Sequence, residues 1–210
     1  MTARPAPATR IPEALAILEF WLGDALGLGW PSANRAALWF GGGVALDQQI
    51  TQTFGPLARE AAQGGLVTWE NGAEDRLALV LLLDQFTRNV FRGQAAAFSG
   101  DARACALALD ALAKGWDYHL PLAGQVFMAM PLIHAESLQV QEQAVAYFTA
   151  LHDRSRKQYG DSVLGNLKSA LEHRDVIARF GRFPHRNVAL GRQSTAQESA
   201  HLQTGQHFGQ

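Results

Sequence analysis

Apolar residues recur along most of this chain at the spacing of one helix face, and the alternation typical of strands is absent. A Gly- and Trp-rich connection, 23–43, follows the first predicted helix. Glycine and proline mark other boundaries, with Gly115 and Pro131 as stops. The pattern predicts about seven to eight helices, at 12–22, 44–63, 73–91, 100–114, 121–130, 137–158, 161–179 and from about Thr195. Because the connections are short, we expect an all-α fold of antiparallel helix pairs.

The segment 73–91 differs from the other predicted helices because its middle is apolar on all sides. This pattern predicts a central helix that is buried all round. Asp84 ends the apolar run, and Arg88 lies four residues further, on the same face. An unpaired buried carboxylate is very costly, so we expect Asp84 and Arg88 to form an ion pair that is at least partly buried.

Length and composition predict one ordinary globular domain. The chain has 210 residues, of which 48% are hydrophobic and 18% charged. We expect a flexible segment at 1–10, a single domain at 11–202 and a polar tail at 203–210. The net charge of −1 argues against nucleic acid and against an anionic membrane surface as partners. No apolar run is long enough to span a bilayer and the N-terminal segment is polar, so the sequence predicts a soluble, cytoplasmic protein.

Metal and cofactor chemistry find little support in the sequence. A single cysteine, Cys105, excludes an intrachain disulfide and a Cys-based zinc site. Phosphate-binding loops, dinucleotide-binding loops and the GxSxG nucleophile motif are absent, so we expect no cofactor. The side chains with the chemistry of metal ligands are Asp84, His134, Glu136, His173 and His185. No pair of them has the tight spacing of a metal motif, so we expect no metal.

The stretch FGRFPHRN, 180–187, is unusual because it combines aromatic residues with closely spaced cations. Gly181 follows an apparent helix end and permits a left-handed cap. We expect a packed turn in which Phe180 and Phe183 are buried anchors. Its cations, Arg182, His185 and Arg186, would then face an inner polar cavity. From 173 to 192 there are five arginines and one acid, so the partners of these arginines must come from elsewhere in the fold or from a ligand.

Two further groups of polar residues belong with this stretch. His134 and Glu136 lie in MPLIHAES, which we interpret as a turn after Pro131, although Glu136 also suits a helix N-terminus. His173 lies on an apolar stripe of its predicted helix, where a histidine is usually a satisfied core residue. Since Asp84 has few other partners, we expect it to approach the 180–187 stretch.

Five blocks of the chain together resemble one bacterial family, the domain of unknown function 924. They are ILEFWLGD at the start, LWFGGG at 38–43, LLLDQFTRNVFRG at 81–93, MPLIHAES at 130–137 and HRDVIARFGRFPHRNVALGRQST at 173–195. Thr87 and Ala196 depart from the pattern, each where the family would have proline. The resemblance implies a TPR-like αα superhelix and brings no agreed activity.

Two hypotheses for function remain open at this point. In the first, the blocks at 84–92, 134–137 and 173–187 converge on one pocket for a small anionic molecule. His134, His173 or His185 would act as general base or acid there, oriented by Asp84 or Glu136. The residues expected to bind the ligand are Arg88, Asn89, Arg92, Arg182, Arg186 and Asn187. In the second, the protein is a TPR-like module for a peptide or protein partner, and the polar cluster only holds the fold together.

Overall fold

The computed structural model describes residues 11–204, so the predicted segment 1–10 and most of the predicted tail lie outside the described residues. Within 11–204 every regular element is a helix or a helical turn, which confirms the all-α fold. Eight of the helices are longer than two turns, in agreement with the seven to eight predicted. In chain order the α-helices are α1 (Pro12–Leu22), α2 (Ala25–Leu28), α3 (Val44–Ala62), α4 (Ala73–Leu81), α5 (Thr87–Val90), α6 (Asp101–Ala113), α7 (Leu122–Ile133), α8 (Leu138–Tyr159), α9 (Leu164–Phe180) and α10 (Ala196–Thr204).

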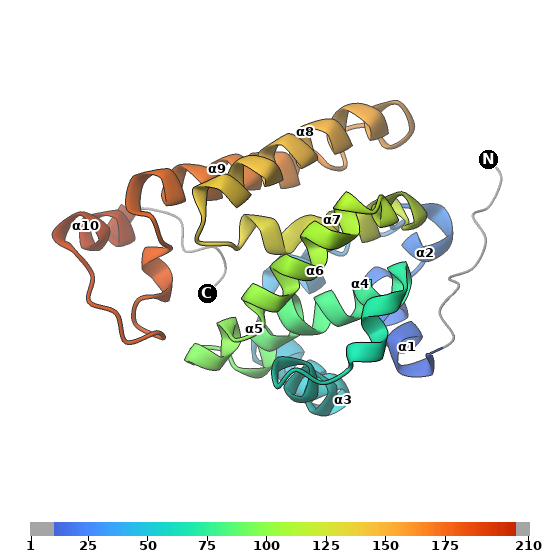
Figure 1. Ribbon diagram of the computed structural model, residues 1–210, viewed down its shortest axis with the longest axis horizontal. Coiled ribbons are helices and arrows are strands. Elements are labelled where there is room, and N and C mark those ends of the chain that lie inside the picture. The colour runs from blue at the N-terminus through green and yellow to red at the C-terminus, as the bar shows by residue number, and fades with distance from the viewer. Residues whose placement is uncertain (1–10, 205–210) are drawn as a thin grey trace.

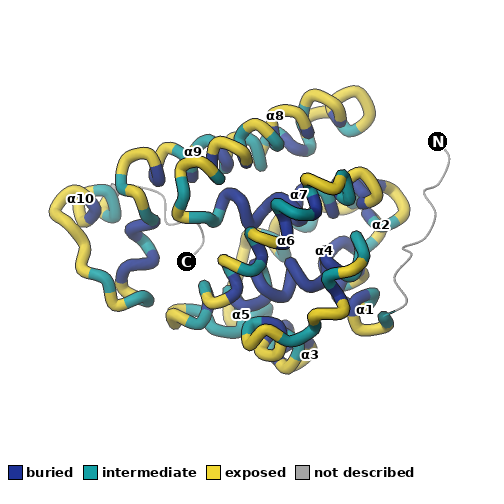
Figure 2. The backbone as a smooth tube through the Cα atoms, in the orientation of Figure 1, coloured by how far each residue is buried: buried dark blue, intermediate teal, exposed yellow. Residues whose placement is uncertain are grey.

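Two helices, α4 and α7, form the centre of the molecule (Figures 1 and 2). The predicted buried segment is confirmed, since residues 77–83 are almost entirely inaccessible. Helix α7 is buried all round as well. Around this centre pack α1, α3 and α6, and the long antiparallel pair α8 and α9 covers α7 on the other side. Consecutive helices therefore pack side by side as expected, and the TPR-like superhelix stays a prediction.

The predicted helix 73–91 contains a change of winding. After α4, the residues Leu82–Phe86 form a single π-helical turn that leads directly into α5. A π turn inside a helix interrupts the usual ladder of backbone hydrogen bonds. The Thr87 hydroxyl donates to the Leu83 carbonyl at 2.7 Å. Asp84 lies in the middle of this turn and is buried.

Pro131 does not end a helix, contrary to the sequence-based prediction. Helix α7 continues through Pro131 to Ile133. Proline lacks one backbone donor, but at this position it affects only the last turn of a helix that is buried on all sides. His134 follows directly as the residue that caps α7. The predicted free turn at 131–137 is therefore shorter, and His134 is held by a rigid helix end.

The C-terminal part returns across the end of α7. Helix α9 ends at Gly181, whose φ of 70° confirms the predicted left-handed cap. Extended residues and the short turn Pro184–Arg186 follow before α10. Phe183 is completely buried and packs on Val176 and Ile177. Phe180 is only half-buried, against His201, so the prediction of two buried anchors holds for Phe183 alone.

The connection 23–43 also packs against the core, as its aromatic content predicts. The Trp39 ring lies 5.0 Å from the Phe127 ring, and its indole nitrogen donates to the Trp21 carbonyl at 2.8 Å. Short helical turns, α2 and Ala37–Gly41, replace the predicted loop. None of the described helices combines the length and the apolar character that crossing a membrane requires.

Candidate functional site

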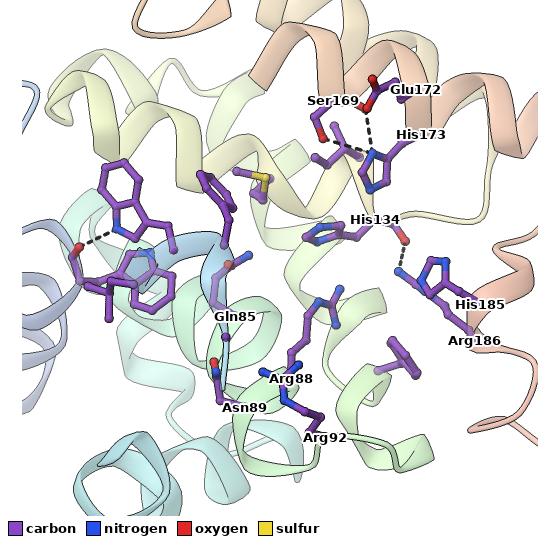
Figure 3. Close-up of a pocket in the computed structure, with 18 residues that line it drawn as sticks. Gln85, Arg88, Asn89, Arg92, His134, Ser169, Glu172, His173, His185 and Arg186 are labelled. Carbon is purple, nitrogen blue, oxygen red and sulfur yellow. Dashed lines mark hydrogen bonds between the residues drawn. The ribbon is translucent and has the colours of Figure 1, made fainter. Parts of the chain in front are cut away.

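A cavity of about 320 Å³ lies where the π turn and α5, the end of α7, α9 and the 184–186 turn meet (Figure 3). The three sequence blocks at 84–92, 134–137 and 173–187 thus contribute to one space. The polar side chains that line it are Gln85, Arg88, Asn89, Arg92, His134, Ser169, Glu172, His173, His185 and Arg186. Three arginines and three histidines among them face only one lining carboxylate, Glu172.

Asp84 orients His134 from behind the cavity wall. The Asp84 carboxylate is completely inaccessible, and the Nδ1–H of His134 donates to it at 2.7 Å. Burial alone would raise the pKa of Asp84, but the charges of His134 and Arg88 and the hydrogen bonds from His134 and Gln85 hold it at about 2. The His134 ring projects into the cavity above Arg88 (Figure 3). Its Nε2 makes no hydrogen bond to the described residues 11–204, and His134 lines the cavity.

Arg88 forms the predicted ion pair with Asp84, and a second acid holds it more closely. Its guanidinium lies 3.4 Å from the Asp84 carboxylate and 3.0 Å from that of Asp101. The Arg88 side chain is 12% exposed, so the expectation of a buried pair is confirmed. Asp101 also accepts from Arg186 at 3.0 Å. Two arginines from distant parts of the chain therefore share one carboxylate.

Arg186 is the most deeply enclosed cation of the site. Its guanidinium lies between the Phe98 and Phe183 rings, 4.7 and 4.6 Å from their centroids. One terminal nitrogen donates to Asp101 and the other to the His134 carbonyl. Its Nε is buried and has no partner within the described chain. Burial, together with the neighbouring charge of Arg88, lowers the pKa of Arg186 to about 10 despite Asp101.

Arg92 and Asn89 form the outer edge of the cavity. Arg92 makes a two-point contact with Asp47 of α3 at 2.6 and 2.9 Å, and Asn89 donates to the same carboxylate at 2.8 Å. The hydrogen bonds from Arg92 lower the pKa of Asp47. The Arg92 side chain is 34% exposed, which makes it the most accessible arginine of the three.

His173 and His185 line the cavity as neutral rings. Burial lowers the pKa of each to about 3, and the charges of nearby cations act in the same direction. His173 donates from Nδ1 to the Ser169 carbonyl at 2.7 Å, which fixes its tautomer. Its ring lies 5.9 Å from that of His134. At neutral pH these two histidines therefore contribute polar atoms without adding charge.

One side of the cavity is apolar. It is formed by Trp21 and Trp39, by Phe40 from the 37–41 turn, and by Met130 and Ile133 of α7. The indole nitrogen of Trp21 is buried and, like the Nε of Arg186, has no hydrogen-bond partner in the described part of the chain. The cavity thus combines an apolar wall with a wall of donors.

Besides Asp84, which stands behind the wall, three of the predicted site residues lie outside the cavity. Glu136 accepts from the Phe183 backbone and from Arg192 at 2.7–2.9 Å, which ties the end of α7 to the C-terminal part. Arg182 makes a two-point contact with Glu198 at 2.6 and 2.9 Å. Asn187 donates to Ser194 at 3.0 Å. The prediction that Arg182 faces the cavity is wrong, because Glu198 of α10 draws it to the opposite side of the turn.

Asp84 approaches the 180–187 stretch only indirectly. Arg186 donates to the His134 carbonyl and His134 donates to Asp84, while Asp101 is the acid that pairs with Arg186. The sequence reasoning did not find Asp101, whose place in the first turn of α6 has an ordinary helix-capping explanation. It also missed Asp47 and the cavity role of Trp21. The one sequence signal was the excess of arginine over acid between 173 and 192, and it bears on Asp101 alone.

Between residues 11 and 204, no group of three His, Cys, Asp or Glu side chains is arranged to hold a metal ion. Fold and site define an all-α protein that encloses a cavity with a cationic, donor-rich wall. A family model described as a bacterial protein of unknown function (DUF924) matches residues 17–206. The chain therefore belongs to the DUF924 family, as the sequence blocks predicted.

A solved structure resembles this chain over nearly its whole length. It is that of a protein of unknown function from Agrobacterium tumefaciens, with 36% sequence identity and a TM-score of 0.72. The similarity covers 91% of this chain and 97% of the other. A search of curated proteins found none that matches this sequence.

Proposed function

We propose that the cavity binds a small organic anion through Arg88, Arg92 and Arg186. The observation that carries this proposal is the arrangement of the ion pairs around the cavity. All three arginines line it, whereas their acid partners Asp47, Asp84 and Asp101 are not among the lining residues. Each pair therefore turns its positive end to the cavity, and arginine is well suited to hold a carboxylate or phosphate there.

Two buried donors support the same proposal. The Trp21 indole nitrogen and the Arg186 Nε belong to lining residues and have no partner between residues 11 and 204. Buried donors are nearly always hydrogen-bonded, because an unmade bond costs about 1–3 kcal/mol. Neither atom is accessible in this structure, so an anion with several acceptor oxygens would satisfy such donors after a small shift of the neighbouring side chains. It would also relieve the repulsion between Arg88 and Arg186 that lowers the pKa of Arg186.

A second candidate function, proton transfer on the bound anion, rests on the hydrogen bond between Asp84 and His134. A buried carboxylate that holds Nδ1–H leaves Nε2 as the basic atom, directed to the cavity. His134 would take a proton from the ligand, or from a water beside it, at Nε2. Asp84 would keep the ring in its tautomer and stabilise the resulting imidazolium.

The proposal is tested by following the melting temperature while phosphate, sulfate and simple carboxylates are titrated in a buffer without other multivalent anions. A ligand at 100 times its dissociation constant adds about 2.7 kcal/mol to the free energy of unfolding. For a chain of this size, that corresponds to roughly 5–10 °C. We expect at least one anion to give such a shift with the parent protein and a much smaller one with Arg92→Gln.

Arg182→Gln is the matched control. Arg182 and Arg92 are similarly accessible, at 30% and 34%, and each makes a two-point contact with one carboxylate, but Arg182 lies outside the cavity. It should keep the full response to the anion. Equal responses of the parent and both variants to every anion would mean that the polar cluster only stabilises the fold, as the interaction-module hypothesis supposes.

A further inference from the structure

A second cavity of about 540 Å³ adjoins the first. Four residues line both spaces, namely Trp39, Phe40, Met130 and Ser169. Three of these are apolar, and we call the four shared residues between the two cavities the waist.

The helices that flank the waist extend along both cavities. On α9, Gly165 and Asn166 line the second cavity, Ser169 lines both, and His173 lines the first. These positions follow the spacing of one helix face. On α7, Val126 lines the second cavity, Met130 both and His134 the first, again at intervals of four residues. Two helix faces thus run along both cavities, which together we call the groove.

The groove is long compared with a small anion. From Gly165 to His173 the α9 face rises about 12 Å, at 1.5 Å per residue. Arg88, Arg92, Arg186 and His134 lie at one end of it. The second cavity is lined by a single arginine, Arg35, which donates to the Phe20 and Trp21 carbonyls, and the waist offers aromatic and thioether surface. Peptide groups there would lose hydrogen bonds to water, whereas a hydrocarbon chain would gain from burial.

We propose that the ligand is an elongated amphiphilic acid. Its anionic head lies against Arg88 and Arg186, and its unbranched apolar body passes the Trp39–Met130 waist into the second cavity. This inference rests on the proposed anion site and names the class of molecule that would fill it. Gly165 lines the second cavity, and a methyl group on it would meet no atom within 4 Å, so a side chain can be added at this position.

The test is calorimetric titration of the full chain with straight-chain carboxylates, from acetate to decanoate and below their micelle concentrations. Each added methylene should tighten binding about fourfold until the groove is filled. Gly165→Leu places an apolar plug in the second cavity at a helix position that tolerates a side chain. It should bind the shortest acids like the parent and stop gaining affinity at a shorter chain length.

Gly27→Leu serves as the control, since Gly27 is an exposed α2 residue that also has open space around it and lines neither cavity. It should follow the parent at every chain length. Acids that bind with the same affinity regardless of length, or a Gly165→Leu protein that follows the parent throughout, would overturn the two-cavity ligand and leave the anion site intact. Failure of every acid to bind would overturn the anion site as well.

Discussion

At the scale of single residues, the site depends on which side of each ion pair faces the cavity. Asp84 and Asp101 are acids that the fold places behind Arg88. Removing one partner of such a buried pair typically costs about 3–5 kcal/mol, because the other charge stays buried without compensation. These pairs therefore hold the arginines in place, and the cost of ordering them is met during folding, as the proposed anion site would require.

His173 provides a prediction for pH dependence. The pKa of His173 is about 3 in the folded protein, whereas the ordinary value of 6.5 applies to the unfolded chain. Below pH 6.5 the unfolded chain therefore binds a proton that the folded chain does not. Stability is therefore lost as the pH falls. Between pH 7 and pH 5 this single ring should lower the free energy of unfolding by about 2 kcal/mol.

Urea unfolding of the parent and of His173→Gln at both pH values measures this contribution, and the variant should lose about 2 kcal/mol less on acidification. His119→Gln is the control, because the exposed His119 ring is solvated in both states. The same acid sensitivity in the parent and in His173→Gln would contradict a buried, neutral His173.

At the scale of elements, the position of α6 decides where Asp101 meets the two arginines. Gly100, just before α6, lies directly against the Leu83 carbonyl of the π turn, and a Cβ there would overlap that oxygen. The absence of a side chain at residue 100 thus allows α6 to start beside the π turn. Asp101 is brought within 3.0 Å of both Arg88 and Arg186 as a result.

Gly100→Ala should therefore be destabilising, although alanine normally favours a helix. Because the obstacle is backbone and cannot rotate away, we expect a loss of about 1–3 kcal/mol or more in the free energy of unfolding. Thermal melting measures it. Gly165→Ala, where the added methyl meets open space near the start of α9, should be neutral or slightly stabilising. A Gly100→Ala protein as stable as Gly165→Ala would show that α6 is not held by this contact.

At the scale of the whole molecule, the C-terminal part closes the cavity over a core that does not need it. The main hydrophobic cluster extends from Ala14 to Ala170, while Val176, Ile177 and Phe183 form a small separate cluster. His185 and Arg186 reach the cavity only because the chain turns back after α9 (Figure 1). We therefore expect the core to fold without the C-terminal part.

A chain that ends at Phe180 should fold with most of its helix content and lose its response to anions. It should be less stable by at least about 1.5–3 kcal/mol, the usual contribution of burying a phenylalanine such as Phe183. Circular dichroism and the anion titration provide the two measurements. A truncated chain that keeps the full anion response would show that Arg186 plays no part in binding.

The sequence by itself determined the helices, their order and the central buried segment, because helical periodicity is a local property of neighbouring residues. It also indicated which residues are unusual: Asp84 at the end of an apolar run, and the 180–187 stretch with more cations than local acids. The family could be predicted as well, from the five sequence blocks that resemble it. The π turn at 82–86 and the continuation of α7 past Pro131 were not predicted, since packing on all sides compensates there for lost backbone hydrogen bonds.

Only the tertiary structure decided which partners the cations meet. Asp101 lies 85 residues before Arg186 and Asp47 lies 45 residues before Arg92, so no local pattern connects them. The same holds for Arg182, which Glu198 holds away from the cavity although Arg186, four residues on, lines it. Whether a charge faces a cavity or a carboxylate depends on how distant helices pack, and hydrophobic burial sets that packing without regard to the sequence distance between the charges.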